Sequence, residues 1–419
     1  MHVENPWKTD DWFVSPWDYM EETTRGFALP GKVLIQDATL RDGEQQAHVV
    51  FREDDKVRIA EALAELGVHR LEAGWVTASA HDEAAVRRIV KLNLGFEVLC
   101  PSRGVEEDIK RTLDCGVDGI RLTAPGSDLL RGVGLGWSRE KVIEVLANGT
   151  RLARQLGAKH IQISIVDGTR TEMPSYLDMF SAVVREGEVD SVVLTDTMGT
   201  LTPQAVAMAT VKLKQATKRP IEAHFHNDFG FGVANAIQCV LAGAEVIHCT
   251  VNGIGERAGN TPLEETVLAL RTLYGIDVGI KYGKLREVAR LVEELSGVPM
   301  LRNRGFVGET AYHIESGMPV DEYRNIAEKL GSDVANTASF AVHHRFVGSP
   351  EPYVVLGKMS GRGNVLWWAD RLGMVLEKDE VSSVVAAVKE RAYELGRSLD
   401  EAEFRQIVDD VRARSRSRG

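Results

Sequence analysis

Residues 224–228, with the sequence HFHND, place two imidazoles, His224 and His226, two positions apart. The apolar run 220–223 before them predicts that they end a β-strand. Side chains two apart on a strand point to the same side, so the two imidazoles can meet at one point. Such a pair can bind a divalent metal, although two histidines satisfied by hydrogen bonds at a strand end would show the same spacing.

Two further segments offer the remaining ligands of such a metal. Residues 37–45 (DATLRDGEQ) end an earlier predicted strand with a cluster of charge that includes Asp42. Two imidazoles and one carboxylate leave positions around a divalent ion open for water or substrate. Residues 252–260 (NGIGERAGN) follow the last predicted strand, and Asn260 can add an amide oxygen. The small residues of this segment allow close approach of backbone to a ligand, but they would also suit a tight surface turn.

Short β-branched runs alternate with amphipathic helical patterns over residues 32–280 and supply the elements that must position these side chains. The strand candidates are 33–40, 69–75, 96–101, 119–124, 160–166, 191–197, 220–227 and 246–252. Eight strands, each followed by a helix, predict an α/β fold of the (β/α)8 TIM-barrel type. An open doubly wound sheet would call for a Gly-rich turn after the first strand, where this chain is charged. We assign residues 1–31 to an N-terminal extension and 281–419 to small, mainly helical C-terminal subdomains.

Polar residues gather where the predicted strands end, as the active sites of TIM barrels do. They include 37–45, Glu72, Arg103, 121–123, 164–170, 196–197, 224–228 and 252–260. This placement predicts an enzyme.

Composition narrows the function further. The 419 residues carry a net charge of -11, which argues against a nucleic-acid-binding protein that works through a basic field. No apolar run approaches the roughly 20 residues of a membrane span, and the first residues lack the layout of a signal peptide. We therefore expect a cytoplasmic protein that binds neither nucleic acid nor membrane.

The segments 37–45, 224–228 and 252–260 together resemble the signatures of the DRE-TIM metallolyase superfamily. Within it, residues 196–199 (DTMG) and 356–362 (LGKMSGR) resemble the isopropylmalate synthase and homocitrate synthase branch. The resemblance implies a Claisen-type condensation of acetyl-CoA with a 2-oxo acid, in a homodimer that needs a divalent metal. Mn, Mg, Zn and Co all suit oxygen and imidazole ligands.

The resemblance also implies roles for individual residues. The family's metal ligands correspond to Asp42, His224, His226 and Asn260 in this sequence. Arg41 would polarise the oxo-acid carbonyl, and Thr197 would bind its carboxylate. We place three more polar residues of the strand ends in the substrate pocket: Gln45, Glu72 and Ser164.

Two departures from the family pattern concern acid–base chemistry. Val166 occupies the position of the family's glutamate on the fifth strand. Pro319 occupies the position of the family's histidine that is associated with deprotonating the acyl-CoA. We name His313, Glu315 and Asp167 as candidates to replace them, although His313 could equally be a packing or capping histidine.

A third departure concerns the substrate. On strand four, where relatives that use branched apolar oxo acids often carry a histidine, this chain has Arg121. An inward guanidinium needs an anionic partner, which predicts a second anionic group on the oxo acid. Oxaloacetate, 2-oxoglutarate or a phosphonopyruvate would qualify, the last in an enzyme similar to phosphonomethylmalate synthases. The product would be a 2-hydroxy-2-alkyl dicarboxylate. A structural ion pair with Asp118 or Glu72 is the alternative.

Two other functions stay open on the sequence alone. The superfamily contains carbon–carbon lyases, and the missing base weakens the case for a synthase. The loop 253–260, however, lacks the cysteine of the hydroxymethylglutaryl-CoA lyase branch. A catalytically silent barrel that acts as a binding partner would leave four metal ligands without a purpose.

Overall fold

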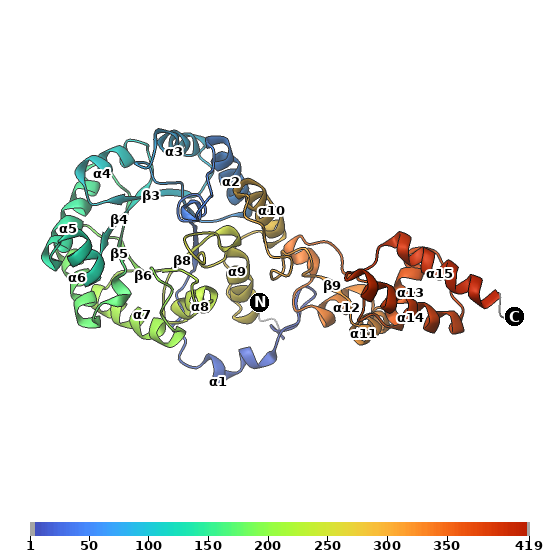
Figure 1. Cartoon of the computed structure of the whole chain (residues 1–419). Helices are drawn as coiled ribbons and strands as arrows, with labels where there is room; N and C mark the ends of the chain where they lie inside the picture. Colours follow the sequence, from blue (N-terminus) through green and yellow to red (C-terminus); the bar gives the residue numbers. More distant parts are fainter. Residues whose placement is uncertain (1–4, 417–419) are drawn as a thin grey trace. The chain divides into compact units, whose positions relative to one another are not determined.

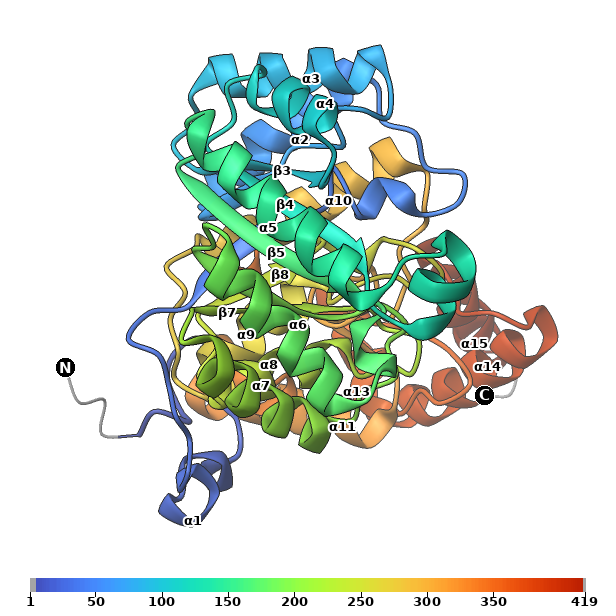
Figure 2. The same ribbon diagram turned by 90° about the vertical axis from the view of Figure 1, so that its left-hand side faces the viewer.

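A computed structural model of the chain describes residues 5–416. They form two compact units, of which one is Trp17–Met300 and the other joins residues 5–16 with 301–416. Figure 1 shows the first unit as a ring of strands surrounded by helices, and Figure 2 shows the same unit from the side, with helices in front of the strands.

The strands of the first unit close into a barrel in the order β1 to β8. Neighbouring strands are parallel, and Leu34 of β1 pairs with Val246 of β8 to complete the ring. The strands are β1 (Leu34–Asp37), β2 (Arg70–Glu72), β3 (Glu97–Arg103), β4 (Gly119–Pro125), β5 (His160–Val166), β6 (Ser191–Asp196), β7 (Ile221–Phe225) and β8 (Val246–Cys249). This closed sheet confirms the predicted TIM barrel.

Helices connect successive strands and cover the outside of the barrel (Figure 1). Each buries its apolar stripe, as α2 does with Ile59, Leu63 and Leu66. The helices of this unit are α1 (Glu21–Thr24), α2 (Glu53–Leu66), α3 (Ala80–Leu92), α4 (Glu106–Leu113), α5 (Arg139–Gln155), α6 (Met173–Glu186), α7 (Pro203–Thr217), α8 (Gly232–Leu241), α9 (Leu263–Leu273) and α10 (Leu285–Ser296). Among the residues described, no helix is long and apolar enough to cross a lipid bilayer.

The barrel unit extends past residue 280, where the sequence pattern changes. The reason is α10, whose buried face includes Val288 and Val292. The Asn252 side chain, which comes from the loop after β8, donates a hydrogen bond of 2.7 Å to the carbonyl of Ala289. This helix therefore supports the loop that carries the predicted ligand segment 252–260.

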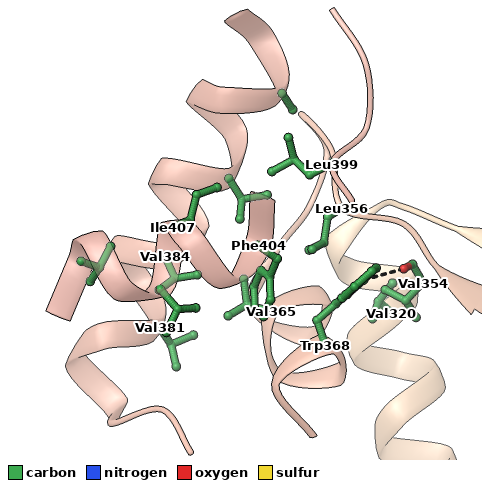
Figure 3. Close-up of a cluster of buried hydrophobic side chains, with 14 residues drawn as sticks. Val320, Val354, Leu356, Val365, Trp368, Val381, Val384, Leu399, Phe404 and Ile407 are labelled. Atoms are coloured by element: carbon green, nitrogen blue, oxygen red, sulfur yellow. Dashed lines mark hydrogen bonds between the residues drawn. The ribbon is translucent and has the colours of Figure 1, made fainter. Parts of the chain in front are cut away.

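The second unit contains α11 (Gly317–Leu330), α12 (Ser332–Ser339), α13 (Arg362–Arg371), α14 (Lys378–Leu395) and α15 (Glu401–Arg416). It also has a short parallel pair that we did not predict, β9 (His313–Ile314) and β10 (Tyr353–Val354). Its core packs Phe404 and Trp368 among valines of α13, α14 and α15, with Leu356 and Leu399 from the segments between the elements (Figure 3). The Trp368 indole donates a hydrogen bond of 2.8 Å to the carbonyl of Val354, which ties the helices to β10.

Candidate metal centre and active site

Three of the predicted ligands converge at the carboxyl ends of β1 and β7. Asp42, His224 and His226 are all buried, and each offers a ligand atom within 4.8 Å of those of the other two. Asp42 is positioned by a tight turn after β1, in which its amide donates to the carbonyl of Ala38. Nε2 of His224 lies 2.9 Å from Oδ2 of Asp42, and Nε2 of His226 lies 3.8 Å from the same oxygen.

Asn260 completes this cluster. It forms an isolated antiparallel bridge with His226, and its Nδ2 donates to Oδ2 of Asp42 at 2.9 Å. Its other side-chain atom, Oδ1, is buried without a hydrogen-bond partner among the residues described. Gly255 makes room for this amide, because a Cβ there would lie 2.6 Å from Oδ1. A buried carbonyl oxygen with no donor beside two imidazoles and a carboxylate fits a divalent cation.

Charges near the cluster set protonation states that suit a metal. Burial alone would raise the pKa of Asp42, but Arg41 and the two imidazoles hold it well below its usual value. Burial lowers the pKa of His224 to about 3, against the opposing pull of Asp42. At neutral pH the aspartate is therefore ionised and the imidazole is neutral, which are the forms that bind metals.

Arg41 lies beside the cluster and is held in place by its neighbours. Its Nε donates to Oε2 of Glu72 at 2.6 Å, and its Nη1 donates to Oε1 of Gln45 at 3.1 Å. Its Nη2 lies 3.3 Å from Oδ2 of Asp42. Against the effect of burial, Arg121 and Arg41 lower the pKa of Glu72 to about 2, so this carboxylate stays ionised.

Arg121 faces Glu72, as one of the alternatives foresaw. Its Nη1 and Nη2 lie 2.7 Å and 3.0 Å from the two carboxylate oxygens. Asp118 is engaged elsewhere, with Lys159 and the amide of Val98. Burial lowers the pKa of Arg121 to about 10, so the guanidinium is charged at neutral pH. Its Nε has no hydrogen-bond partner among the residues described, which leaves one buried donor for a ligand.

The remaining barrel candidates lie on β5 and after β6. Thr197 Oγ1 accepts a hydrogen bond of 2.7 Å from the amide of Asp167 and can still donate its own proton. Ser164 pairs with Thr195 at 2.7 Å inside the barrel. The carboxylate of Asp167 is bound by Arg170 at 2.5 Å and 2.8 Å, so it is committed to a local ion pair.

His313 and Glu315 belong to the second unit. His313 lies on β9 with its ring 5.2 Å from that of Tyr353. Glu315 Oε1 accepts a hydrogen bond of 3.1 Å from the amide of Met359, and its carboxylate lies against Gly357. Their proposed acid–base role stays a prediction.

The sequence analysis missed a group of polar residues inside the barrel, below the metal cluster. His248 contacts both His224 and Arg121, and Glu222 lies behind it. Gln36 and Gln162 link Glu72 to Glu222 through hydrogen bonds of 2.8 Å. In the sequence these residues stand as single polar residues within otherwise apolar strands.

The chain is similar to known proteins over most of its length. Residues 32–292 match the family model described as HMGL-like. A homocitrate synthase of Methanopyrus kandleri is 38% identical over 94% of this chain and 96% of its own length. A 2-isopropylmalate synthase of Methanocaldococcus jannaschii is 33% identical over 94% of this chain and 74% of its own length.

Similarity to solved structures supports the fold of the chain and nothing beyond it. The hydroxymethylglutaryl-CoA lyase of Bacillus subtilis superposes with a TM-score of 0.59 at 20% sequence identity. The match covers 66% of this chain and 97% of the lyase.

Proposed function

The chain belongs to the HMGL-like family, in the branch that contains homocitrate and 2-isopropylmalate synthases, and from this premise we propose that it condenses acetyl-CoA with a 2-oxo acid. The observation that carries the proposal is the buried cluster of Asp42, His224 and His226 with Arg41 at its edge. The similarity to synthases over 94% of the chain supports condensation over the lyase alternative.

The residues of the cluster have distinct tasks in this reaction. Asp42, His224, His226 and Asn260 would hold a divalent cation (Mn, Mg, Zn or Co), which supplies Lewis-acid activation of the oxo acid when bound. Arg41 stabilises the negative charge that develops on the carbonyl oxygen as the new carbon–carbon bond forms. The Thr197 hydroxyl donates to the carboxylate of the oxo acid, with Gln45 and Ser164 lining the pocket. His313 and Glu315 remain our candidates for moving the acetyl proton.

We further propose that the oxo acid carries a second anionic group. Arg41 and Arg121 balance Asp42 and Glu72, so a bound divalent cation leaves two positive charges in excess in a buried space. A dianionic acid such as oxaloacetate, 2-oxoglutarate or a phosphonopyruvate would neutralise them. The open Nε donor of Arg121 supports the same conclusion. By the family resemblance we also propose a homodimer that works in the cytoplasm.

Thiol release from acetyl-CoA tests the proposed reaction. We expect release in the presence of Mn²⁺ with one or more dianionic 2-oxo acids, and loss of release after the metal is chelated. The double variant His224→Ala/His226→Ala should lose at least about 100-fold in rate, because two metal ligands are gone. Absence of thiol release with every acceptor, or full turnover in the double variant, would refute the proposal.

A further inference from the structure

Glu222, on β7, is a fully buried carboxylate that several donors surround. Its Oε1 accepts from Ser191 Oγ at 2.5 Å and lies 3.2 Å from Nη1 of Arg70. Its Oε2 accepts from Gln162 Nε2 at 2.8 Å and lies 2.8 Å from Nε2 of His248. A carboxylate with this many donors is ionised and can only accept, so Nε2 of His248 carries a proton and donates it to Glu222.

The opposite nitrogen of His248 is then fixed as an acceptor. Nη1 of Arg121, which can only donate, lies 3.2 Å from Nδ1 of His248. A proton on Nδ1 would face the guanidinium proton, so Nδ1 offers a lone pair instead. The same Nδ1 lies 3.3 Å from Nδ1 of His224.

Nδ1 of His248 has one lone pair, which Arg121 and His224 share at 3.2 Å and 3.3 Å, so His224 must supply the proton in its own contact with His248. A neutral imidazole with its proton on Nδ1 has its lone pair on Nε2. Nε2 of His224 is the atom that lies 2.9 Å from Asp42. A lone pair and a carboxylate oxygen that face each other at this distance favour a cation bound by both.

We propose that Glu222 and His248 are positioning residues, which hold His224 in the tautomer and ring orientation that present its Nε2 to the metal. The inference rests on the proposed metal centre and extends it inward by two side chains. Metal-binding histidines commonly donate their second nitrogen to a carboxylate or carbonyl, and loss of that partner costs about 10–100-fold in metal affinity. Here a second histidine transmits the effect of the carboxylate, because Glu222 contacts His248 and not His224.

Co²⁺ binding to the full-length metal-free protein tests the proposal without reference to turnover. Affinity is measured by calorimetry, and the ligand field by the visible absorption of bound Co²⁺. His248→Leu removes both the donor and the acceptor, and we expect it to weaken Co²⁺ binding about 10–100-fold. His248→Gln restores a donor toward Glu222 and an acceptor toward His224, so it should recover much of the lost affinity. Glu222→Gln, which keeps the shape of the carboxylate, is the second variant if His248→Leu does not fold.

A matched control separates positioning from general destabilisation. His69 accepts a hydrogen bond of 3.1 Å from the amide of Ile35, and among the residues described no hydrogen bond or ion pair joins it to Asp42, His224 or His226. His69→Ala should lower the melting temperature but leave Co²⁺ affinity unchanged. Wild-type affinity and an unchanged spectrum in both His248→Leu and Glu222→Gln would overturn the positioning role. Failure of the wild-type protein itself to bind Co²⁺ would instead overturn the metal centre.

Discussion

Arg121 is the residue whose surroundings bear most directly on substrate choice. Its guanidinium contacts Glu72 and His248, and its buried Nε donor has no partner within the part of the chain that the structure describes. The ion pair with Glu72 makes Arg121 a structural residue. Its open Nε donor also makes it a candidate for substrate recognition. The two roles predict different effects of substituting Arg121.

Arg121→Ala should change the preference among oxo acids as well as the overall rate. Loss of the donor removes a charge-assisted contact to a second anionic group, which is worth about 1.5–3 kcal/mol. We expect kcat/KM to fall about 10–100-fold more for oxaloacetate or 2-oxoglutarate than for 2-oxoisovalerate. Steady-state kinetics on this panel measure the ratio. An equal loss on all acceptors would leave Arg121 with its structural role only.

The sequence predicted that polar residues meet where a motif ends a strand, and the structure brings Asp42, His224 and His226 together at such ends. Asp42 and His226 belong to segments whose polar residues follow apolar runs, and the barrel brings such ends together. His248 and Glu222 were missed because each is a single polar residue in a buried strand. Their partners come from strands far apart in the sequence, so no local pattern links them.

At the scale of elements, the end of β1 holds a second buried carboxylate, that of Asp37. Asp37 accepts from the amide of Thr39 at 2.8 Å and from its hydroxyl at 3.0 Å. The Thr39 hydroxyl also accepts a hydrogen bond of 2.8 Å from the amide of Val251, which links β1 to the loop after β8. Burial raises the pKa of Asp37 to about 7, opposed by the hydrogen bonds from Thr39.

This shift predicts that Asp37 makes the fold less stable as pH rises. Between the pKa of about 4 in the unfolded chain and the pKa of about 7 in the folded protein, folding takes up a proton. The penalty is therefore absent below about pH 4 and fully present above about pH 7. Asp37→Asn should raise the free energy of unfolding at pH 8 and lose this advantage toward pH 4. Urea titrations at several pH values measure it, and a variant whose stability follows the wild type at every pH would contradict the shift.

Element-scale prediction was most accurate for strands with clear turn signals on both sides. The strand predicted over 160–166 coincides with β5. The last barrel strand was predicted to reach residue 252, but β8 ends at Cys249. The chain turns there because Asn252 adopts a left-handed conformation with φ 58°. β9 and β10 have two residues each, which is too short to leave a period in the sequence.

At the scale of the whole molecule, contacts between residues far apart in the sequence decide which segments form each unit. A local sequence pattern does not show these contacts. Residues 5–16 join the unit formed by 301–416 through backbone hydrogen bonds. The amide of Phe13 donates to the carbonyl of Ala341 at 2.9 Å, and that of His343 donates to the carbonyl of Asp11 at 2.7 Å. Trp12 packs edge-on against Phe346, with ring centroids 5.6 Å apart. The sequence pattern predicted the helices of this unit but did not indicate that residues 5–16 pack with them.

The second unit has its own core, so its stability and the metal centre should respond to different substitutions. Phe404 is fully buried, with its ring centroid 5.8 Å from that of Trp368. Phe404→Ala leaves a cavity that should cost about 3–5 kcal/mol in the unfolding of this unit. Tyr393→Ala, which removes an aromatic side chain that is 67% exposed and has the Lys358 ammonium 5.7 Å from its ring centroid, is the matched control and should cost under about 1 kcal/mol. Urea unfolding followed by tryptophan fluorescence, to which Trp367 and Trp368 of this core contribute, measures both. Co²⁺ affinity should stay at the wild-type value in each variant, because Asp42, His224 and His226 all lie in the barrel unit. Equal costs for the two substitutions would contradict the assigned core, and weakened Co²⁺ binding in Phe404→Ala alone would show that the metal centre needs the second unit intact.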